Sequence, residues 1–280
     1  MTERMIETPV HRPTSTAEAL ALLSAPGTEV LAGATWAMRD DGAPPGGYVA
    51  IASLDELQRI THSDGELTVG SAVTHASLAR TDLPAAAAAL AQAAAASAFT
   101  AIRTVATVGG NVAARSFAEA DLVPALIALD AIATVASGDG EHRLPVARLR
   151  EHGCAPGELI THFTIPTPAG RRSAFQRLTI RGGAEYAVVS VAVSVDLEGS
   201  TVTSARVTIG AAEAQPRLCA RAAEALVGGT LGERAPAAAA ALVAELSPRT
   251  DHAAPGWYRR EVSGHLLGRV LSQLRTGANH

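Results

Sequence analysis

The feature that most constrains the fold of this chain is a change in its secondary-structure pattern near residue 170. Before it, short helical and extended patterns alternate, which is typical of α/β units. After it, two long extended patterns fill "YAVVSVAVSVDLEGSTVTSARVTIGAAE", and helical patterns dominate from Pro216 onwards. The polar run "PTPAGRRS" between these parts carries two prolines and a glycine. Because 280 residues reach the size at which single cores stop growing, we predict two domains, residues 1–168 and 169–280.

Local signals place several elements within these domains. Ser15 and Glu18 form a capping-box pattern, which predicts a short helix that ends at Pro26–Gly27. "TEVLAGA" then reads as a strand that enters a tight loop. Asp64–Gly65 predicts a hairpin turn, and Glu198–Gly199 predicts the turn between the two long strands. The alanine-rich run "LPAAAAALAQAAAASAF" and the segment "DLVPALIALD" are both expected to be helical.

Composition excludes several classes of function. The formal net charge is −4 and the pI about 6.1, so nothing in the composition indicates binding to nucleic acid or to an anionic membrane. Cys154 and Cys219 are too few for an iron–sulfur cluster or a four-cysteine zinc site within this chain. The nine histidines are scattered singly, so we expect no metal site. The polar N-terminus and the absence of a disulfide pattern favour the cytoplasm.

Two glycine-containing segments are candidates for binding phosphate. "LAGATWAMRD" (Leu31–Asp40) and "TVGGNVA" (Thr107–Ala113) each follow an extended run and carry no cationic side chain in the turn itself. Residues without a Cβ let backbone N–H groups approach a phosphate closely. A pyrophosphate held by such N–H groups, with the Thr35 and Thr107 hydroxyls and the Asn111 amide, fits both segments. Either segment alone is better explained as an ordinary turn, whereas the two together favour a phosphate site, although neither matches the usual dinucleotide or nucleotide fingerprint.

The residues of these segments carry a resemblance over nearly the whole chain. "ATVGGNVAARSFAEADLVPALIALDA", "LAGAT" and "RGGAEYAVVSVAVSV" resemble segments of the FAD-binding medium subunit of the molybdenum hydroxylases, the family of xanthine dehydrogenase and carbon monoxide dehydrogenase. The first of these matches is specific, whereas each of the other two is weak. The resemblance implies an α+β fold, with an N-terminal FAD-binding domain of two α/β subdomains. It also implies a C-terminal α+β domain with a three-stranded antiparallel sheet and helices.

The resemblance further implies which residues bind FAD, while no side chain is expected to be catalytic. Backbone groups of the two glycine segments would hold the pyrophosphate, a carboxylate would accept hydrogen bonds from a sugar hydroxyl, and a tyrosine would cover one face of the isoalloxazine. The predicted cofactor-binding residues are Ala32, Gly33, Ala34, Thr35, Trp36, Thr107, Gly109, Gly110, Asn111, Asp121 and Tyr186.

Simpler interpretations remain open for some of these residues. Asp121 is also well placed to cap the helix that follows it. Tyr186 is also consistent with a core aromatic side chain. Arg181 would offset charge beside the flavin, or else it would be an ordinary exposed arginine.

The first glycine segment departs from the family pattern at two positions. Ala34 stands where a second glycine is usual, which costs on the order of 1 kcal/mol if the backbone there has a positive φ. Trp36 occupies the later position of the segment. Its indole would either stack on the adenine or fill the groove and exclude the cofactor.

The implied activity is electron transfer as an FAD-dependent oxidoreductase subunit. Such a subunit takes electrons from a two-cluster iron–sulfur small subunit, next to a molybdopterin-binding large subunit, and passes them to an external acceptor such as NAD, oxygen or a quinone. Two alternatives stay open: a stand-alone flavoenzyme that acts on a small molecule, and a cofactor-free scaffold with a degenerate site. Neither the substrate of the complex nor its electron acceptor follows from the sequence.

Overall fold

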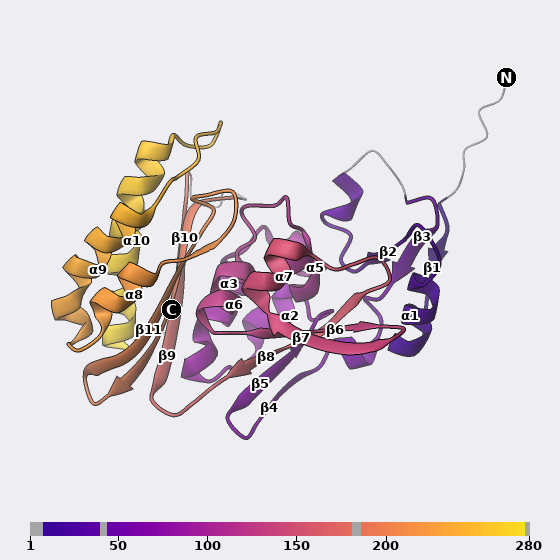
Figure 1. The fold of residues 1–280 in the computed structure, drawn as a ribbon, viewed down its shortest axis with the longest axis horizontal. Coiled ribbons are helices and arrows are strands. Elements are labelled where there is room, and N and C mark those ends of the chain that lie inside the picture. Colours follow the sequence, from indigo (N-terminus) through magenta and orange to yellow (C-terminus); the bar gives the residue numbers. More distant parts are fainter. Residues whose placement is uncertain (1–7, 40–43, 181–185, 278–280) are drawn as a thin grey trace.

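The structure is a computed structural model, and it describes residues 8–39, 44–180 and 186–277. Three parts follow one another along the long axis of the molecule (Figure 1). A small N-terminal sheet with its helix lies at one end, a mixed sheet-and-helix unit lies in the middle, and the C-terminal sheet with its helices lies at the other end. The N-terminal domain therefore consists of two subdomains, and the structure is mixed α and β as expected.

The first subdomain is a three-stranded parallel sheet in the order β1-β3-β2. Helix α1 packs beside it around a small apolar core that includes Ala19, Leu23 and Val49. Ser15 caps α1 by accepting a hydrogen bond from the Glu18 N–H (3.1 Å). The elements are β1 (Val10–His11), α1 (Thr16–Leu23), β2 (Thr28–Leu31), η1 (Ala37–Arg39), β3 (Gly47–Ala50) and η2 (Asp55–Leu57).

The predicted capping box of α1 is only half formed. The Glu18 carboxylate accepts from the backbone N–H and the hydroxyl of Thr14, at 2.7 and 2.8 Å, and not from the Ser15 N–H. The reason is that Thr14 offers two donors to one carboxylate oxygen, whereas the box would offer only one.

The second subdomain has a five-stranded antiparallel sheet in the order β4-β5-β8-β6-β7. The hairpin predicted at Asp64–Gly65 joins β4 to β5. All seven residues of α6 are buried, which explains its continuous apolar sequence. The strands are β4 (Ile60–Ser63), β5 (Glu66–Gly70), β6 (Ile132–Ser137), β7 (Gly140–Pro145) and β8 (Leu159–Pro166), and the helices are α2 (His75–Arg80), η3 (Ala85–Ala87), α3 (Ala88–Ala96), α4 (Thr100–Arg103), α5 (Val108–Ala113), α6 (Leu122–Ala128) and α7 (Val146–His152).

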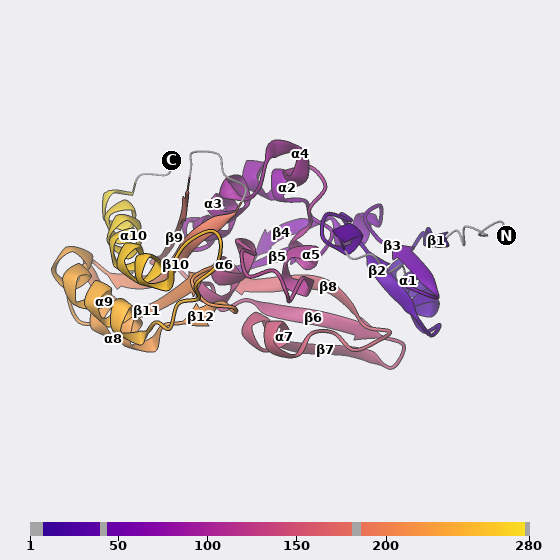
Figure 2. The same ribbon diagram turned by 90° about the horizontal axis from the view of Figure 1, so that it is seen from above.

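The C-terminal domain is an antiparallel sheet covered by helices on one face, while α3 and α6 of the preceding domain lie against the other (Figures 1 and 2). Its order is β12-β11-β10-β9. The three long strands match the expected three-stranded sheet, and the two-residue β12 adds a fourth at the edge. The first nine residues of β10 are buried because both faces of the sheet are covered. The elements are β9 (Arg171–Thr179), β10 (Ala187–Glu198), β11 (Thr201–Gly210), β12 (Arg217–Leu218), α8 (Ala220–Leu226), α9 (Leu231–Glu245) and α10 (Gly256–Thr276).

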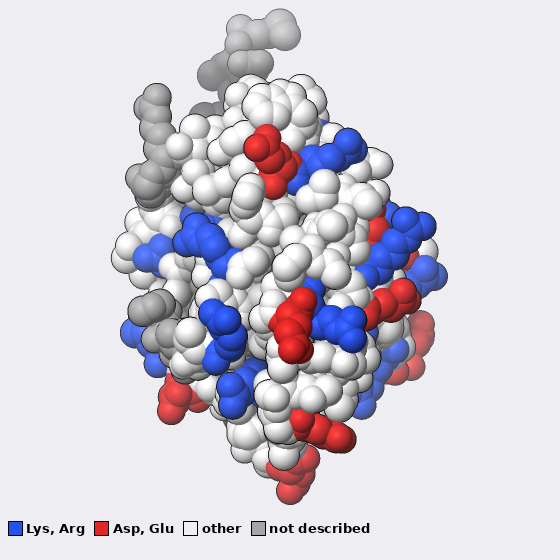
Figure 3. Space-filling model, turned by 90° about the vertical axis from the view of Figure 1, so that its left-hand side faces the viewer, with Lys and Arg blue, Asp and Glu red and all other residues white. Residues whose placement is uncertain are grey.

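The surface at the C-terminal end of the molecule is of mixed charge. Figure 3 shows acidic and basic side chains interspersed over that face, separated by uncharged areas. Among the helices that the structure describes, none combines the length and the apolar character needed to span a membrane.

Candidate functional site

A cavity of about 450 Å³ lies where the two N-terminal subdomains meet, and its wall reaches the start of the C-terminal domain. Four stretches supply most of its lining, within residues 29–37, 71–75, 97–121 and 154–160, and Tyr186 contributes from the C-terminal domain. All eleven residues predicted from the sequence to bind the cofactor line this one cavity, although they come from segments far apart in the chain. Arg181, the additional residue considered beside the flavin, lies outside the described residues.

The first glycine segment presents backbone N–H groups at the cavity. It leaves the end of β2, and the N–H groups of Gly33, Ala34 and Thr35 have no hydrogen-bond acceptor among the described residues. A Cβ at Gly33 would lie 2.0 Å from the carbonyl oxygen of Val105, so only glycine fits where this loop crosses the other subdomain. Ala34 has φ +60°, the left-handed conformation in which alanine costs about 1 kcal/mol. The segment thus has a strained backbone at Ala34, and three of its backbone N–H groups have no acceptor among the described residues.

The second glycine segment is not a loop, and this corrects the sequence interpretation. Gly109 and Gly110 lie in the first turn of α5, which Thr107 caps by accepting from the Gly110 N–H (3.1 Å). The Gly109 N–H donates to the Ser71 carbonyl (2.8 Å), and the Asn111 N–H donates to the Thr107 carbonyl (2.9 Å). These three N–H groups, expected to bind pyrophosphate, therefore already have acceptors within the protein.

The structure explains in two different ways why glycine stands at each of the two positions in α5. A Cβ at Gly109 would lie 2.7 Å from the Ser71 side chain, so this position requires glycine for close packing of the chain. A Cβ at Gly110 would meet only the Thr107 hydroxyl, at 3.0 Å, and Gly110 lines the cavity. Gly110 therefore keeps the cavity open, whereas Gly109 lets α5 pack closely against Ser71, which directly follows β5.

Asn111 links the second segment to α6. Its Oδ1 accepts a hydrogen bond from the Leu122 N–H (3.2 Å), one of the donors at the start of α6 that the helix itself leaves unsatisfied. Its amide nitrogen has no acceptor among the residues that the structure describes and remains a donor beside the cavity.

Asp121 stands at the N-cap position of α6 but makes no capping hydrogen bond with its side chain, so the interpretation as a cap is wrong. Its Oδ2 is 2.6 Å from Nη1 of Arg177 on β9, and the two side chains are only 3% and 10% exposed. Its Oδ1 is buried and has no hydrogen-bond partner within the part of the chain that the structure describes. Burial raises the pKa of Asp121 to about 6, although the charge of Arg177 and the hydrogen bond from it act in the opposite direction.

Three aromatic rings form part of the cavity wall. Trp36 stacks on Phe117 with 4.6 Å between ring centroids, and Phe117 meets Tyr186 edge to face at 5.5 Å. Trp36 therefore lies against another wall residue. The sequence analysis did not identify Phe117. Its position between the glycine pair and Asp121, in a chain with only nine aromatic residues, could have indicated it.

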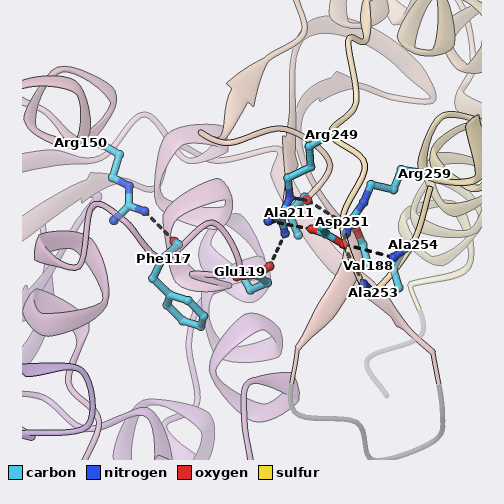
Figure 4. A network of polar contacts seen from close by, with 10 residues as sticks. All are labelled: Phe117, Glu119, Arg150, Val188, Ala211, Arg249, Asp251, Ala253, Ala254 and Arg259. Carbon is cyan, nitrogen blue, oxygen red and sulfur yellow. Dashed lines mark hydrogen bonds and ion pairs between the residues drawn. The ribbon is translucent and has the colours of Figure 1, made fainter. Parts of the chain in front are cut away.

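Arg150 is a second residue that sequence reasoning missed. Its guanidinium is almost fully buried, and besides one bond to Gln215 it donates to four carbonyl groups, one within α5 and three in the connection between α5 and α6. Those carbonyl groups belong to Val112, Ala114, Arg115 and Phe117. Figure 4 shows the bond to Phe117. Burial lowers the pKa of Arg150 to about 10, so it stays charged at neutral pH. Arg150 thereby fixes the backbone of the wall segment that carries Phe117.

A buried histidine also lines the cavity. His75 opens α2, and its Nδ1 lies 2.7 Å from the Ser97 hydroxyl. Burial lowers the pKa of His75 to about 4, so its ring is neutral at pH 7. Within the described residues, the structure contains no group of three or more histidine, cysteine or acidic side chains that would hold a metal ion.

Comparison with known proteins identifies this fold. The model of the FAD binding domain in molybdopterin dehydrogenase matches residues 4–168, and that of the CO dehydrogenase flavoprotein C-terminal domain matches residues 173–274. A flavin-binding domain followed by this C-terminal domain defines a class, the flavoprotein subunits of multi-subunit oxidoreductases. The chain belongs to the FAD-binding medium subunits of the molybdenum hydroxylases.

Individual relatives align along most of the chain. It is 32% identical to subunit alpha of the 6-hydroxypseudooxynicotine dehydrogenase complex of Paenarthrobacter nicotinovorans, over 82% of this chain and 79% of that protein. It is 29% identical to the carbon monoxide dehydrogenase medium chain of Afipia carboxidovorans, over 96% and 97%. A chain of quinoline 2-oxidoreductase from Pseudomonas putida 86 superposes with a TM-score of 0.85 at 26% identity, over 99% of this chain and 100% of that one.

Proposed function

We propose that this subunit holds FAD in the cavity between its subdomains and relays electrons from a partner iron–sulfur subunit to an external acceptor. The observation that carries the proposal is the convergence of all eleven predicted residues on one cavity, where the N–H groups of the first loop have no acceptor in residues 8–39, 44–180 and 186–277. Bound FAD would supply the redox chemistry, since a flavin exchanges one or two electrons. The protein would supply position, orientation and electrostatics.

The first loop is the better candidate for holding the pyrophosphate. Its N–H groups at Gly33, Ala34 and Thr35 lack acceptors among the described residues, and a diphosphate would satisfy several of them at once. The hydroxyl of Thr35 lies in the same loop, and no described residue bonds to it. A strained backbone of this kind at Ala34 is typical of a ligand-binding loop.

The second segment would contact the cofactor through its side chains and the open wall at Gly110, and not through backbone N–H groups. Gly110 leaves the cavity wall without a side chain, and the Asn111 amide nitrogen offers a donor there. Oδ1 of Asp121 has no partner among the residues that are described, which suits it to accept from a cofactor hydroxyl once that oxygen becomes accessible. Arg177 would hold the carboxylate in place while it does so.

The aromatic part of the wall would bind the planar rings. Tyr186 would cover one face of the isoalloxazine, as the family resemblance implies. Trp36 rests on Phe117 and lines the cavity, which favours a wall residue that stacks on the cofactor over a side chain that fills the groove. This arrangement supports a working flavin site over a degenerate one.

The expected partners are a molybdopterin-binding large subunit and a two-cluster iron–sulfur small subunit. We expect the complex in the cytoplasm. The two cysteines of this chain do not suffice for a cluster of its own, so electrons would come from a partner. The relatives are named as parts of such enzymes: a subunit of a dehydrogenase complex and a medium chain of carbon monoxide dehydrogenase.

Electron transfer between subunits provides the test. The FAD-loaded chain is mixed in a stopped-flow instrument with the two-cluster iron–sulfur subunit of its complex, reduced beforehand with dithionite and desalted. The proposal predicts that the flavin absorption bleaches on mixing, and that an oxidised iron–sulfur subunit leaves it unchanged. A flavin that only a small-molecule substrate reduces, and never the iron–sulfur subunit, would indicate a stand-alone flavoenzyme.

A further inference from the structure

The two domains touch across the cavity wall through aromatic rings. Phe117 belongs to the connection between α5 and α6, and Tyr186 directly precedes β10 of the C-terminal domain. Their rings meet at 5.5 Å and 71°. An edge-to-face pair contributes only about 0.5–1.5 kcal/mol beyond its buried area, which is little for setting the relative position of two domains. Other contacts must therefore fix the distance between these two sides of the wall.

A path of charged side chains joins the same two places (Figure 4). Glu119, which also lines the cavity, pairs with Arg249 of the C-terminal domain. Nη1 of Arg249 lies 3.0 Å from Oδ2 of Asp251, and Oδ1 of Asp251 lies 2.6 Å from Nη2 of Arg259. Arg259 donates to the carbonyl of Val188, near the start of β10. We call the four charged residues 119, 249, 251 and 259 the domain clamp.

The domain clamp contains two acidic and two basic side chains in alternation, and each of them forms an ion pair with its neighbour along the path. These pairs restrict the positions of the four side chains. Arg259 is 0% exposed, and a cation at that depth requires a paired carboxylate. Burial would raise the pKa of Asp251, but the N–H groups of Ala253 and Ala254, together with Arg259, hold it below its usual value. Asp251 is therefore charged at neutral pH and keeps both arginines in place.

We propose that the domain clamp positions Tyr186 against Phe117 and Glu119, and so sets the shape of the cavity wall. Arg249 and Asp251 are its positioning residues, because they act through Glu119 on one side and through Arg259 and Val188 on the other. The effect of the domain clamp on FAD affinity rests on the proposed function. Its effect on the position of the cavity wall does not.

The test variant is Arg249→Gln, which removes the ion pair to Glu119 but leaves Asp251 paired with the buried Arg259. Arg206→Gln is the matched control. Arg206 also joins the two domains, since it donates to the Ile127 carbonyl (3.1 Å) and pairs with Asp130 (3.2 Å). Neither Ile127 nor Asp130 lines the cavity. Both variants thus remove one interdomain arginine, but only Arg249→Gln acts on the cavity wall.

Trp36 gives a readout that needs no cofactor. It stacks on Phe117, and the chain has only one other tryptophan, Trp257, which is 67% exposed. In a Trp257→Phe background, Arg249→Gln should shift the Trp36 emission maximum to longer wavelength, whereas Arg206→Gln should not. FAD titration of the same proteins should show affinity weakened by about 2- to 30-fold for Arg249→Gln alone, the range of coupling energies carried by such networks. Arg249→Lys, which keeps the charge, should recover part of both effects.

Equal changes in the two variants, or no change in Arg249→Gln, would overturn the proposal. If Arg249→Gln does not fold, Glu119→Gln breaks the same ion pair from the other side and must give the same two shifts. If the parent protein binds no FAD but Arg249→Gln still moves the Trp36 emission, the proposed function fails while the domain clamp stands.

Discussion

At the scale of single residues, Ala34 is the most informative position because its backbone conformation is costly for alanine. Its φ of +60° lies in the left-handed region, so Ala34→Gly should stabilise the fold by about 1 kcal/mol. Urea unfolding measures this change, with Ala32→Gly as the control. Ala32 has no positive φ, so glycine there should cost about 0.4–1 kcal/mol through the entropy of the unfolded chain. A loss of stability in Ala34→Gly would show that the left-handed conformation is absent.

The two glycines of α5 should respond differently to the same substitution. Gly110→Val places its side chain at the cavity and strains only the Thr107 contact, so the protein should stay folded and lose FAD. Gly109→Val drives its side chain into Ser71 and the backbone there, so it should destabilise the fold by more than about 2 kcal/mol. Flavin content and circular dichroism of the purified variants separate the two effects. A folded Gly110→Val protein with full flavin content would place the cofactor elsewhere.

At the scale of elements, α5 shows why its glycine pair is hard to interpret from sequence. Two adjacent glycines usually indicate a loop, since glycine is a poor helix former. In the structure Thr107 caps the turn and Gly109 packs on Ser71, so tertiary contacts outweigh the local preference. The hairpin at Asp64–Gly65 was predictable because its turn depends only on neighbouring residues.

The connection between α5 and α6 depends on Arg150 from α7. Arg150→Met should leave the carbonyl groups of Val112 and Phe117 without a donor among the described residues, because those of Ala114 and Arg115 also accept from the Phe117 N–H and from Gln215. A carbonyl group that is buried and unpaired costs about 1–3 kcal/mol. We therefore expect a loss of at least about 2 kcal/mol in the free energy of unfolding, measured by urea denaturation. Arg148→Met, on the same helix but at an exposed side chain that pairs with the exposed Glu151, should change stability by less than about 1 kcal/mol. Equal losses in both variants would contradict this role of Arg150.

At the scale of the whole molecule, the order of the parts could be predicted from sequence, but the contacts between them could not. The family resemblance implied the fold class correctly, and the two long extended patterns correspond to β10 and β11, whereas the domain boundary at residues 168/169 stays a prediction. The pairing of Phe117 with Trp36 and the burial of Arg150 depend on residues far apart in the chain, and no local pattern reports them. Asp121 was predicted as a cofactor-binding residue and lines the cavity, but its partner Arg177 in the other domain was not predicted.

The burial of Asp121, which outweighs the effect of Arg177 on its pKa, should make stability depend on pH. Asp121 has a pKa of about 6 in the folded protein against an ordinary value of 3.8, so the folded state binds more protons than the unfolded state between these values. The contribution of Asp121 to stability is therefore greatest below about pH 4 and falls as the pH rises through 6, by about 3 kcal/mol in all. Asp121→Asn should remove this slope from unfolding curves measured between pH 4 and 7. A parent protein whose stability rises throughout that range, with the same profile in Asp121→Asn, would contradict it.

The central claim is that the cavity binds a flavin through its diphosphate at the first loop, and titration of the same protein with FAD and with FMN tests it most directly. FMN carries the isoalloxazine but lacks the diphosphate bridge to adenosine. Because each charge-assisted hydrogen bond contributes about 1.5–3 kcal/mol, we expect one FAD per chain and FMN binding at least about 100-fold weaker. Equal affinity for FAD and FMN, or no uptake of FAD by the folded protein, would contradict the account.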